Sequence, residues 1–222
     1  MQEHRIVTTR RARYYTIGGG EQPLAESWIV LHGLGQLASA FITYFQSIES
    51  PSRLIVAPEA LSRHYVMEQG SRSSDAKVGA TWMTRQDREA EIADYVDYLD
   101  AVWREVGGAS RVTVLGFSQG VATAARWIAM GKSRVDRFIA WAGQIPDDVD
   151  PSAFTKLSEG ITIVSGSKDE FASWIDEGDH KGRLEAVGIK PEVLTFDGGH
   201  RMDRLTLDAI ASAATPASRK TP

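Results

Sequence analysis

The stretch from Val112 to Trp127, VTVLGFSQGVATAARW, decides the fold class of this chain. Its first half is apolar and β-branched, which is typical of a buried strand, and its second half repeats small and apolar residues at helical spacing. Ser118 lies between these halves in the pentapeptide GFSQG, with a glycine two residues away on each side. A side chain at either glycine would collide with its neighbours in so tight a turn. The pattern predicts a sharp strand-to-helix turn, either a plain tight turn or one that presents Ser118 as a nucleophile.

Similar apolar runs recur along the chain and alternate with helical patterns. Apolar residues three and four positions apart fill residues 92–106, between the second and third runs, and another helical pattern follows Ser118. This alternation is typical of a mostly parallel central sheet with helices on both faces, so the sequence predicts an α/β fold. The predicted strands begin at Ser27, Arg53, Arg111, Asp136, Ile161 and Pro191.

Three segments fall outside this alternation. Residues 4–17 are predicted to form one or two antiparallel edge strands that end at three glycines. Residues 62–79 are polar and have no clean period, so they are expected to form a functional loop or a partial lid. Residues 211–222 are expected to form a flexible tail. Because there is no internal repeat or linker, residues 1–222 are predicted to be a single domain.

Composition limits the classes of function. With 222 residues, 42% hydrophobic and 24% charged, the chain has the make-up of an ordinary soluble globular protein. Its net charge of -4 argues against nucleic acid or an anionic membrane as the main partner, since both usually require a basic face. The absence of cysteine excludes disulfides and thiolate chemistry. No apolar run suits a membrane span and the N-terminus lacks the apolar core of a signal peptide, so a cytoplasmic location is expected.

A nucleophilic serine needs a base, and the base needs an acid that holds it. In the chain order that accompanies such a turn, the acid and then the histidine follow the serine, which leaves His180 and His200 as candidates. His180 lies in a hydrophilic helical run and is expected to be solvated, whereas His200 follows a strand and two glycines. His200 is therefore the predicted base. Asp169, which follows the strand that begins at Ile161, is the predicted acid, with Glu170 as the alternative.

Acyl transfer also needs two backbone N–H groups that stabilise the negative oxygen of the intermediate. One is predicted at Gln119, because the free amides at the start of a helix favour an anion. The other is predicted at Leu34, in the glycine-flanked loop after the strand that begins at Ser27. His32 lies just before this loop and ahead of the serine in the chain, so it is expected to shape the loop rather than to act as a base.

With these sites in place, the sequence resembles the small carboxylesterases of the phospholipase/carboxylesterase family, which includes the acyl-protein thioesterases. The resemblance rests on WIVLHGLG, LGFSQG, SGSKDE and DGGHRMD and covers nearly the whole chain. It implies an α/β-hydrolase fold without a large cap, a Ser118-Asp169-His200 triad, no cofactor, and hydrolysis of carboxylic esters or thioesters. The chain departs from the family's common pattern at Gln36 and Val121, and the acyl-site loop of the thioesterases is not recognisable. The resemblance therefore implies ester hydrolysis more directly than deacylation of lipidated proteins.

Other hypotheses remain open at this point. A hydrolase-like binding protein would hold a small ester or lactone without turning it over, although the intact set of serine, acid and histidine argues against it. A metal-dependent hydrolase could use Asp176, Asp179 and His180, but their spacing lacks the H-E-x-x-H pattern, and no metal is expected. Trp82 and Met83 are candidates either for a pocket wall or for core packing. A small-molecule ester is the expected partner, and the sequence makes no prediction of the oligomeric state.

Overall fold

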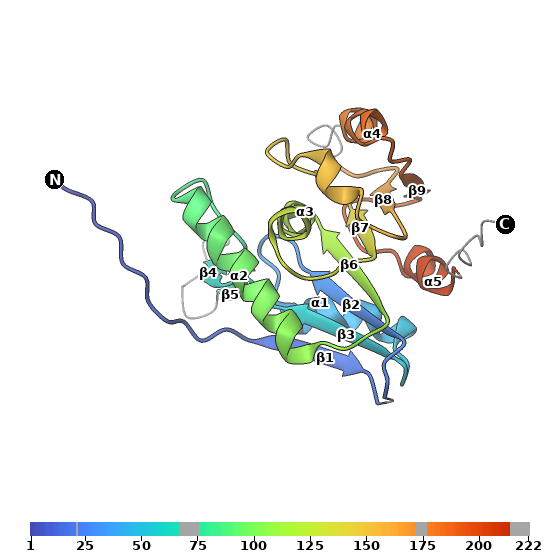
Figure 1. Cartoon of the computed structure of the whole chain (residues 1–222), viewed down its shortest axis with the longest axis horizontal. Helices are drawn as coiled ribbons and strands as arrows, with labels where there is room; N and C mark the ends of the chain where they lie inside the picture. The colour runs from blue at the N-terminus through green and yellow to red at the C-terminus, as the bar shows by residue number, and fades with distance from the viewer. Residues whose placement is uncertain (21, 67–75, 172–176, 214–222) are drawn as a thin grey trace.

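A central β-sheet organises the computed structural model, which describes residues 1–20, 22–66, 76–171 and 177–213 (Figure 1). Within these residues the sheet has seven strands in the order β1-β3-β2-β6-β7-β8-β9. β1 pairs antiparallel with β3, and the other neighbours are parallel, which confirms the mostly parallel sheet. The strands are β1 (Tyr14–Gly18), β2 (Glu26–Leu31), β3 (Arg53–Pro58), β6 (Arg111–Phe117), β7 (Arg137–Trp141), β8 (Ile161–Gly166) and β9 (Glu192–Phe196).

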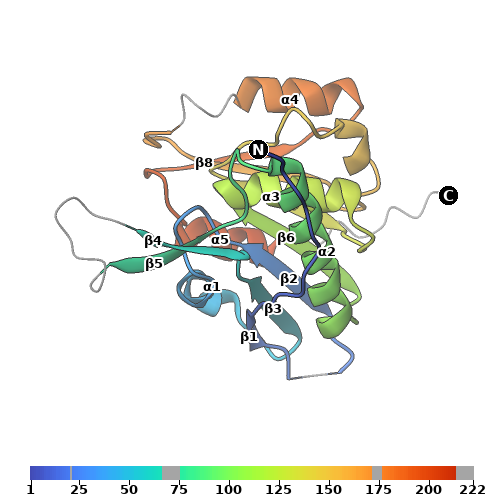
Figure 2. The same ribbon diagram turned by 90° about the vertical axis from the view of Figure 1, so that its left-hand side faces the viewer.

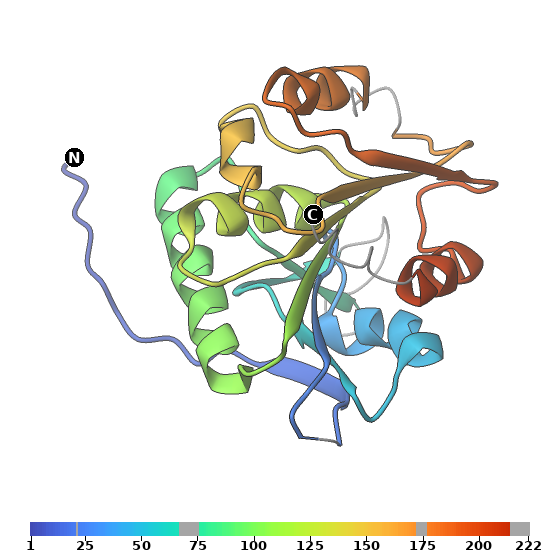
Figure 3. The same cartoon turned by 45° about the vertical axis from the view of Figure 1, so that its right-hand side comes forward.

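Helices cover both faces of this sheet, as the sequence predicts (Figure 3). The long helix α2 and the helix α3 lie on one face, whereas α1, the adjoining 3-10 helix η1 and α5 lie on the other. The helical elements are α1 (Ala38–Phe41), η1 (Ile42–Ile48), α2 (Arg88–Val106), α3 (Gln119–Met130), η2 (Pro151–Phe154), α4 (Glu177–Ala186) and α5 (Arg204–Ser212).

The alternation of side chains along β2 divides the buried core into two parts. Trp28 and Val30 pack with the side of the sheet that α1, η1 and α5 cover, while Ile29 and Leu31 pack with the α2 and α3 side. Successive strand residues point to opposite faces, so a strand covered on both faces has to be apolar along most of its length. This explains why the sequence of β2 is a continuous apolar run rather than an alternating one.

Three segments differ in detail from the sequence prediction. Of residues 4–17 only those from Tyr14 onward belong to a strand, and residues 1–13 lead away from the sheet (Figure 1). Residues 62–79 contain the antiparallel ribbon of β4 (Ser62–Val66) and β5 (Lys77–Thr81) in place of an irregular loop (Figure 2). Residues 67–75 of this predicted lid lie outside the described residues. Helix α5 continues through the first two residues of the predicted tail, and residues 214–222 lie outside the described part.

The parallel strands bring the predicted site residues to one edge of the sheet. Leu34 follows β2, Ser118 follows β6, Asp169 follows β8 and His200 follows β9, each shortly after the carboxyl end of its strand. The carboxyl ends of parallel strands are where α/β proteins bind their ligands. Within the part of the chain that the structure describes, no helix has both the length and the apolarity that crossing a membrane requires. The single-domain organisation stays a prediction from the sequence.

Candidate active site

Ser118 occupies a strained turn between β6 and α3. Its backbone has φ 53° and ψ -119°, a conformation that residues with a side chain rarely adopt. The turn requires glycine at both flanking positions, because other backbone segments lie too close to them for a Cβ atom. A Cβ atom at Gly116 would overlap the backbone of Gly120, and a Cβ atom at Gly120 would overlap the carbonyl oxygen of Leu31. The Ser118 side chain does not cap the helix that it precedes, so its hydroxyl is not used for a helix-end hydrogen bond.

His200 and Asp169 are joined by a hydrogen bond. The Nδ1–H group of His200 donates to Oδ2 of Asp169 over 2.8 Å, and the other carboxylate oxygen accepts the backbone N–H of Phe171, also at 2.8 Å. Asp169 is only 8% exposed, so this bond is shielded from water. Glu170, the alternative acid, instead accepts the backbone N–H of His200 at 3.4 Å. The geometry therefore assigns the contact with the imidazole to Asp169.

Ser118 and His200 line the same cavity, which has a volume of about 420 Å³. The aromatic rings of Phe117 and Phe171 lie beside the imidazole, with ring centroids 5.1 Å and 4.7 Å from that of His200. These contacts restrict the orientation of the His200 ring. The cavity is lined by Leu34, Ser118, Gln119, Ala122, Ala142, Gly143, Gln144, Phe171 and His200, so most of its surface is apolar apart from the candidate reacting groups.

The two residues whose backbone amides are the predicted oxyanion donors, Leu34 and Gln119, also line this cavity. Gln119 is the first residue of α3, where backbone N–H groups have no acceptor within the helix. In the loop after β2, the N–H of Gly33 donates to Oε1 of Gln36 at 2.8 Å, and the N–H of Gly35 donates to the carbonyl of Ala80 at 2.9 Å. Between them, the N–H of Leu34 makes no hydrogen bond to a described residue, and Leu34 is 62% exposed.

His32 shapes this loop, as the sequence predicts. Its ring is buried, and its Nε2 atom accepts the backbone N–H of Ala60 at 3.1 Å. Nδ1 therefore carries the proton of the neutral ring and donates to the carbonyl of Gly33 at 2.8 Å. Burial lowers the pKa of His32, which favours this neutral form. With both nitrogens engaged, His32 has no lone pair left for a proton from a substrate or a serine.

His180 is not the solvated histidine that the hydrophilic run around it suggested. It is 2% exposed and lies on α4, four residues before Leu184, which is also buried. Residues four apart lie on the same face of a helix, so one face of α4 packs inward although its sequence is polar overall. His180 is not among the residues that line the cavity of Ser118.

The groups considered for a metal site are not assembled among the described residues. Asp176 lies outside them, and no cluster of three or more His, Cys, Asp or Glu side chains in the described ranges could hold a metal ion. Trp82 packs into the core beside His32, with ring centroids 5.2 Å apart, and is not a wall of the cavity. Met83 is packed against the same core cluster.

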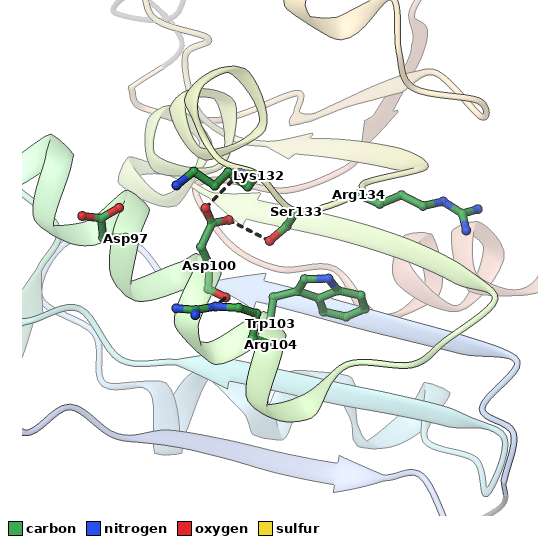
Figure 4. A pocket seen from close by; sticks show the side chains of 7 residues that line it. All are labelled: Asp97, Asp100, Trp103, Arg104, Lys132, Ser133 and Arg134. Carbon is green, nitrogen blue, oxygen red and sulfur yellow. Dashed lines mark hydrogen bonds between the residues drawn. The ribbon is translucent and has the colours of Figure 1, made fainter.

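A second cavity, of about 640 Å³, lies between α2 and the segment that follows α3 (Figure 4). Asp100 of α2 points toward that segment and accepts hydrogen bonds from the backbone N–H of Lys132 at 2.9 Å and the hydroxyl of Ser133 at 2.7 Å. It also accepts the indole N–H of Trp127 at 2.8 Å. These bonds tie the two helices together, and none of the predicted site residues is among those that line this cavity.

The sequence did not point to the segment Ala142–Gly143–Gln144, which forms another wall of the Ser118 cavity. Ala142 has a positive φ of 48° although it is not a glycine. The segment follows β7, the parallel neighbour of β6, so its place at the carboxyl edge of the sheet was the available signal. Phe171 was also missed, and its position two residues after Asp169 was the corresponding signal.

Comparisons with known proteins agree with this architecture. The chain is similar to a carboxylesterase from Mesorhizobium loti, with 17% identity and a TM-score of 0.69 over 90% of this chain and 92% of that chain. It is similar to Zea mays acyl-protein thioesterase 2, with 13% identity and a TM-score of 0.68 over 90% and 96% of the two chains. It is also similar to the esterase PE8, with 21% identity and a TM-score of 0.65 over 91% of this chain and 97% of that chain. At these identities the likenesses show the fold alone.

The family follows from a comparison with family models. No curated protein sequence matches the chain. The model of the phospholipase/carboxylesterase family matches residues 13–213. This range includes every strand of the central sheet and the helices that cover its two faces. The chain therefore has an α/β-hydrolase fold and belongs to the phospholipase/carboxylesterase family.

Proposed function

We propose that the protein is a serine hydrolase that cleaves carboxylic esters through an acyl-enzyme on Ser118. Membership of an esterase and thioesterase family supports hydrolysis in general. The observation that carries the finer proposal is the shared cavity of Ser118 and His200, with His200 bonded at 2.8 Å to the buried carboxylate of Asp169. A serine at a strained turn, a histidine that lines the same cavity and an acid bonded to the histidine are the parts that nucleophilic catalysis needs.

In the first step, the hydroxyl oxygen of Ser118 attacks the ester carbonyl carbon while the Nε2 atom of His200 takes the hydroxyl proton. Nδ1 is held by Asp169, so Nε2 is the ring nitrogen that remains for this transfer. The imidazolium then gives the proton to the leaving alcohol as the ester C–O bond breaks. The carboxylate of Asp169 stabilises the positive charge on the ring and keeps its orientation.

In the second step, water attacks the acyl-enzyme with His200 again as the base, and the acid product leaves with Ser118 restored. Both steps place a negative charge on the former carbonyl oxygen. Leu34 and Gln119 line the cavity, and their backbone N–H groups are the donors that we assign to this charge. Their hydrogen bonds are worth most in the transition state, when the charge is fully developed.

The second candidate function is a hydrolase-like protein that binds a small ester or lactone without turnover. The apolar lining of the cavity suits either function. The bond between His200 and Asp169 favours the enzyme, because a protein that only binds its ligand gains nothing from an imidazole oriented in this way. Thioester cleavage uses the same steps, so the choice between ester and thioester is left to experiment. The cytoplasmic location likewise stays a prediction from the sequence.

The direct test is turnover of aryl esters graded by acyl length, assayed beside a thioester and a lysophospholipid. We expect at least one substrate to be hydrolysed by the wild-type protein and by Ser47→Ala, an exposed serine on η1, but not by Ser118→Ala. Binding of the same substrates to a folded wild-type protein without any turnover would favour the binding function. Equal turnover by Ser118→Ala and wild type would exclude Ser118 as the nucleophile.

A further inference from the structure

The end of strand β5 is hydrogen-bonded both to the side chain of Gln119 and to the loop that carries Leu34. The side-chain amide of Gln119 forms hydrogen bonds with residues 81–83 through both its oxygen and its nitrogen. Oε1 accepts the backbone N–H of Trp82 at 3.1 Å, and Nε2 donates to the carbonyl of Met83 at 2.9 Å and to the hydroxyl of Thr81 at 3.0 Å. The side chain of Gln119 therefore joins the start of α3 to the segment 81–83.

Strand β5 is also bonded to the loop that carries Leu34. Ala80 accepts the N–H of Gly35 at 2.9 Å and donates its own N–H to the carbonyl of Gln36 at 3.1 Å. The chain approaches so closely here that a Cβ atom at Gly79 would overlap the backbone of Gly35. These two hydrogen bonds fix the residues that directly follow Leu34.

The indole of Trp82 completes the connection. Its Nε1–H group donates to the carbonyl of His32 at 2.8 Å, and its ring packs against the His32 ring. His32 is itself held by the backbone of Ala60. The residues before and after Leu34 are thus bonded to β5 and Trp82, and Trp82 is bonded to the side chain of Gln119.

We propose that the Gln119 side chain is a positioning residue that sets the distance between the two oxyanion donors, its own backbone N–H and that of Leu34. This inference rests on the proposed function of Ser118. The side chain acts through the segment 81–83, which it holds with one acceptor and one donor group. A glutamine fits this place because the strand end offers both an N–H and a carbonyl group, and an amide is the side-chain group that pairs with both.

A loss of this connection affects the transition state more than substrate binding. The bound ester carbonyl carries little charge, whereas the tetrahedral intermediate depends on both N–H groups at correct distances. A displacement on the order of 1 Å in such a site costs up to about 100-fold in rate. The G-x-S-x-G motif predicts a role only for the backbone N–H of Gln119, and its side chain has this additional one.

The test uses Gln119→Met, which keeps the length of the side chain and removes its hydrogen bonds. We expect kcat to fall by about 10- to 100-fold with KM changed less than about threefold, since the lost interaction belongs to the transition state. The inhibition constant of an aryl trifluoromethyl ketone, whose serine adduct carries the same oxyanion, should rise by a similar factor. Gln46→Met, at an exposed glutamine of η1, is the matched control and should change neither value.

A double-mutant cycle tests the path through Trp82. Trp82→Phe removes the indole donor to His32, so it should weaken the ketone inhibitor, and adding Gln119→Met should cost much less than the sum of the two single changes. If Trp82→Phe does not fold, a cycle with Thr81→Val tests the other bond of the Gln119 side chain to the segment 81–83, because Thr81 bonds directly to Gln119. Folding is checked by circular dichroism for each variant.

The outcomes separate this inference from the proposed function. If Ser118→Ala is inactive while folded Gln119→Met retains the wild-type kcat and inhibitor affinity, the positioning role is wrong and the nucleophile stands. Additive effects in the cycle would also contradict the path through Trp82. If Ser118→Ala remains active, the proposed function itself fails.

Discussion

At the residue scale, Ser118 combines an unfavourable backbone conformation with a position at the cavity. A residue with a side chain held at such a φ and ψ costs on the order of 1–3 kcal/mol, and the surrounding structure has to stabilise it. Here the N–H of Ser118 donates to the carbonyl of Trp141 at 2.9 Å, and the Ser118 carbonyl accepts the N–H of Val121 at 3.0 Å. Strain of this kind is typical of functional sites, because it costs free energy of folding and is retained where it positions a reactive group.

This strain predicts that Ser118→Gly is more stable than Ser118→Ala. Glycine adopts positive φ without steric conflict, whereas alanine keeps the Cβ atom that causes it. We expect the free energy of unfolding of Ser118→Gly to exceed that of Ser118→Ala by about 1 kcal/mol, measured by urea denaturation. Both variants should be inactive toward esters. Equal stability of the two would show that the turn is not strained.

Asp169→Asn should fold normally and lower kcat by about 10⁴-fold, the scale of the same change in the serine-protease triad. An asparagine that donates toward Nδ1 favours the wrong tautomer of His200, and it cannot stabilise the imidazolium. Glu170→Gln is the control, because Glu170 contacts the backbone rather than the ring of His200. A larger loss in Glu170→Gln than in Asp169→Asn would transfer the role of the acid to Glu170.

Residues in motifs could be predicted from the sequence, and residues placed by packing could not. GFSQG, the chain order of acid and histidine, and the strands that precede Asp169 and His200 predict these three site residues, which the structure brings to one edge of the sheet. Ala142 shows the limit, since alanine as a residue type does not favour its positive φ. His180 shows it as well, because its burial on α4 depends on the elements that pack against that helix.

At the element scale, side chains of α3 bond to segments that lie before it and after it in the chain. Gln119 bonds the segment 81–83, and Arg126 contacts Sδ of Met83 at 3.3 Å. Arg126 also forms two hydrogen bonds with the carboxylate of Asp148, at 2.9 Å and 3.0 Å, and Arg88 of α2 adds a third at 2.8 Å. The helix that carries the nucleophile is thus linked to α2, to β5 and to the segment after β7.

These arginines make the stability of the fold depend on pH. The hydrogen bonds from Arg126, together with that from Arg88, lower the pKa of Asp148 from 3.8 to about 2. Because the folded pKa lies below the unfolded value, this stabilisation is present above about pH 4 and is lost as the pH falls from 4 to 2. The difference in free energy of unfolding between wild type and Asp148→Asn, from urea denaturation, should shrink over that range. A difference that stays constant from pH 5 to pH 2 would contradict the assignment.

The elements themselves were predictable to different degrees. Parallel strands buried on both faces, such as β2, have continuous apolar sequences, which makes them predictable from the sequence. The sequence predicts a loop where the ribbon of β4 and β5 lies, because the ribbon's residues are polar and mostly exposed outside its last three positions. The ribbon is stabilised by pairing between its strands and by the hydrogen bonds of Ala80 to the loop after β2. Such contacts do not produce a regular pattern of apolar residues in the sequence.

At the scale of the whole molecule, four strand ends have to meet before any of this chemistry is possible. β6 lies between β2 and β7 in the sheet, so the amide of Leu34 approaches from one side, and Asp169 and His200 approach from β8 and β9 on the other. No short stretch of the chain contains the complete site. The alternation of strands and helices predicted this arrangement, because parallel strands place their carboxyl ends at one edge.

The central claim is that this assembly makes Ser118 a nucleophile, and labelling with a fluorophosphonate tests it most directly. Attack of the activated serine on phosphorus expels fluoride and leaves a tetrahedral adduct that mimics the acyl-transfer intermediate. Intact-mass analysis should show one adduct per chain, and peptide sequencing should place it on Ser118. Labelling should be absent in Ser118→Ala and much slower in His200→Ala. A folded wild-type protein that stays unlabelled, or that carries the label on Ser165 or Ser167, would contradict the account.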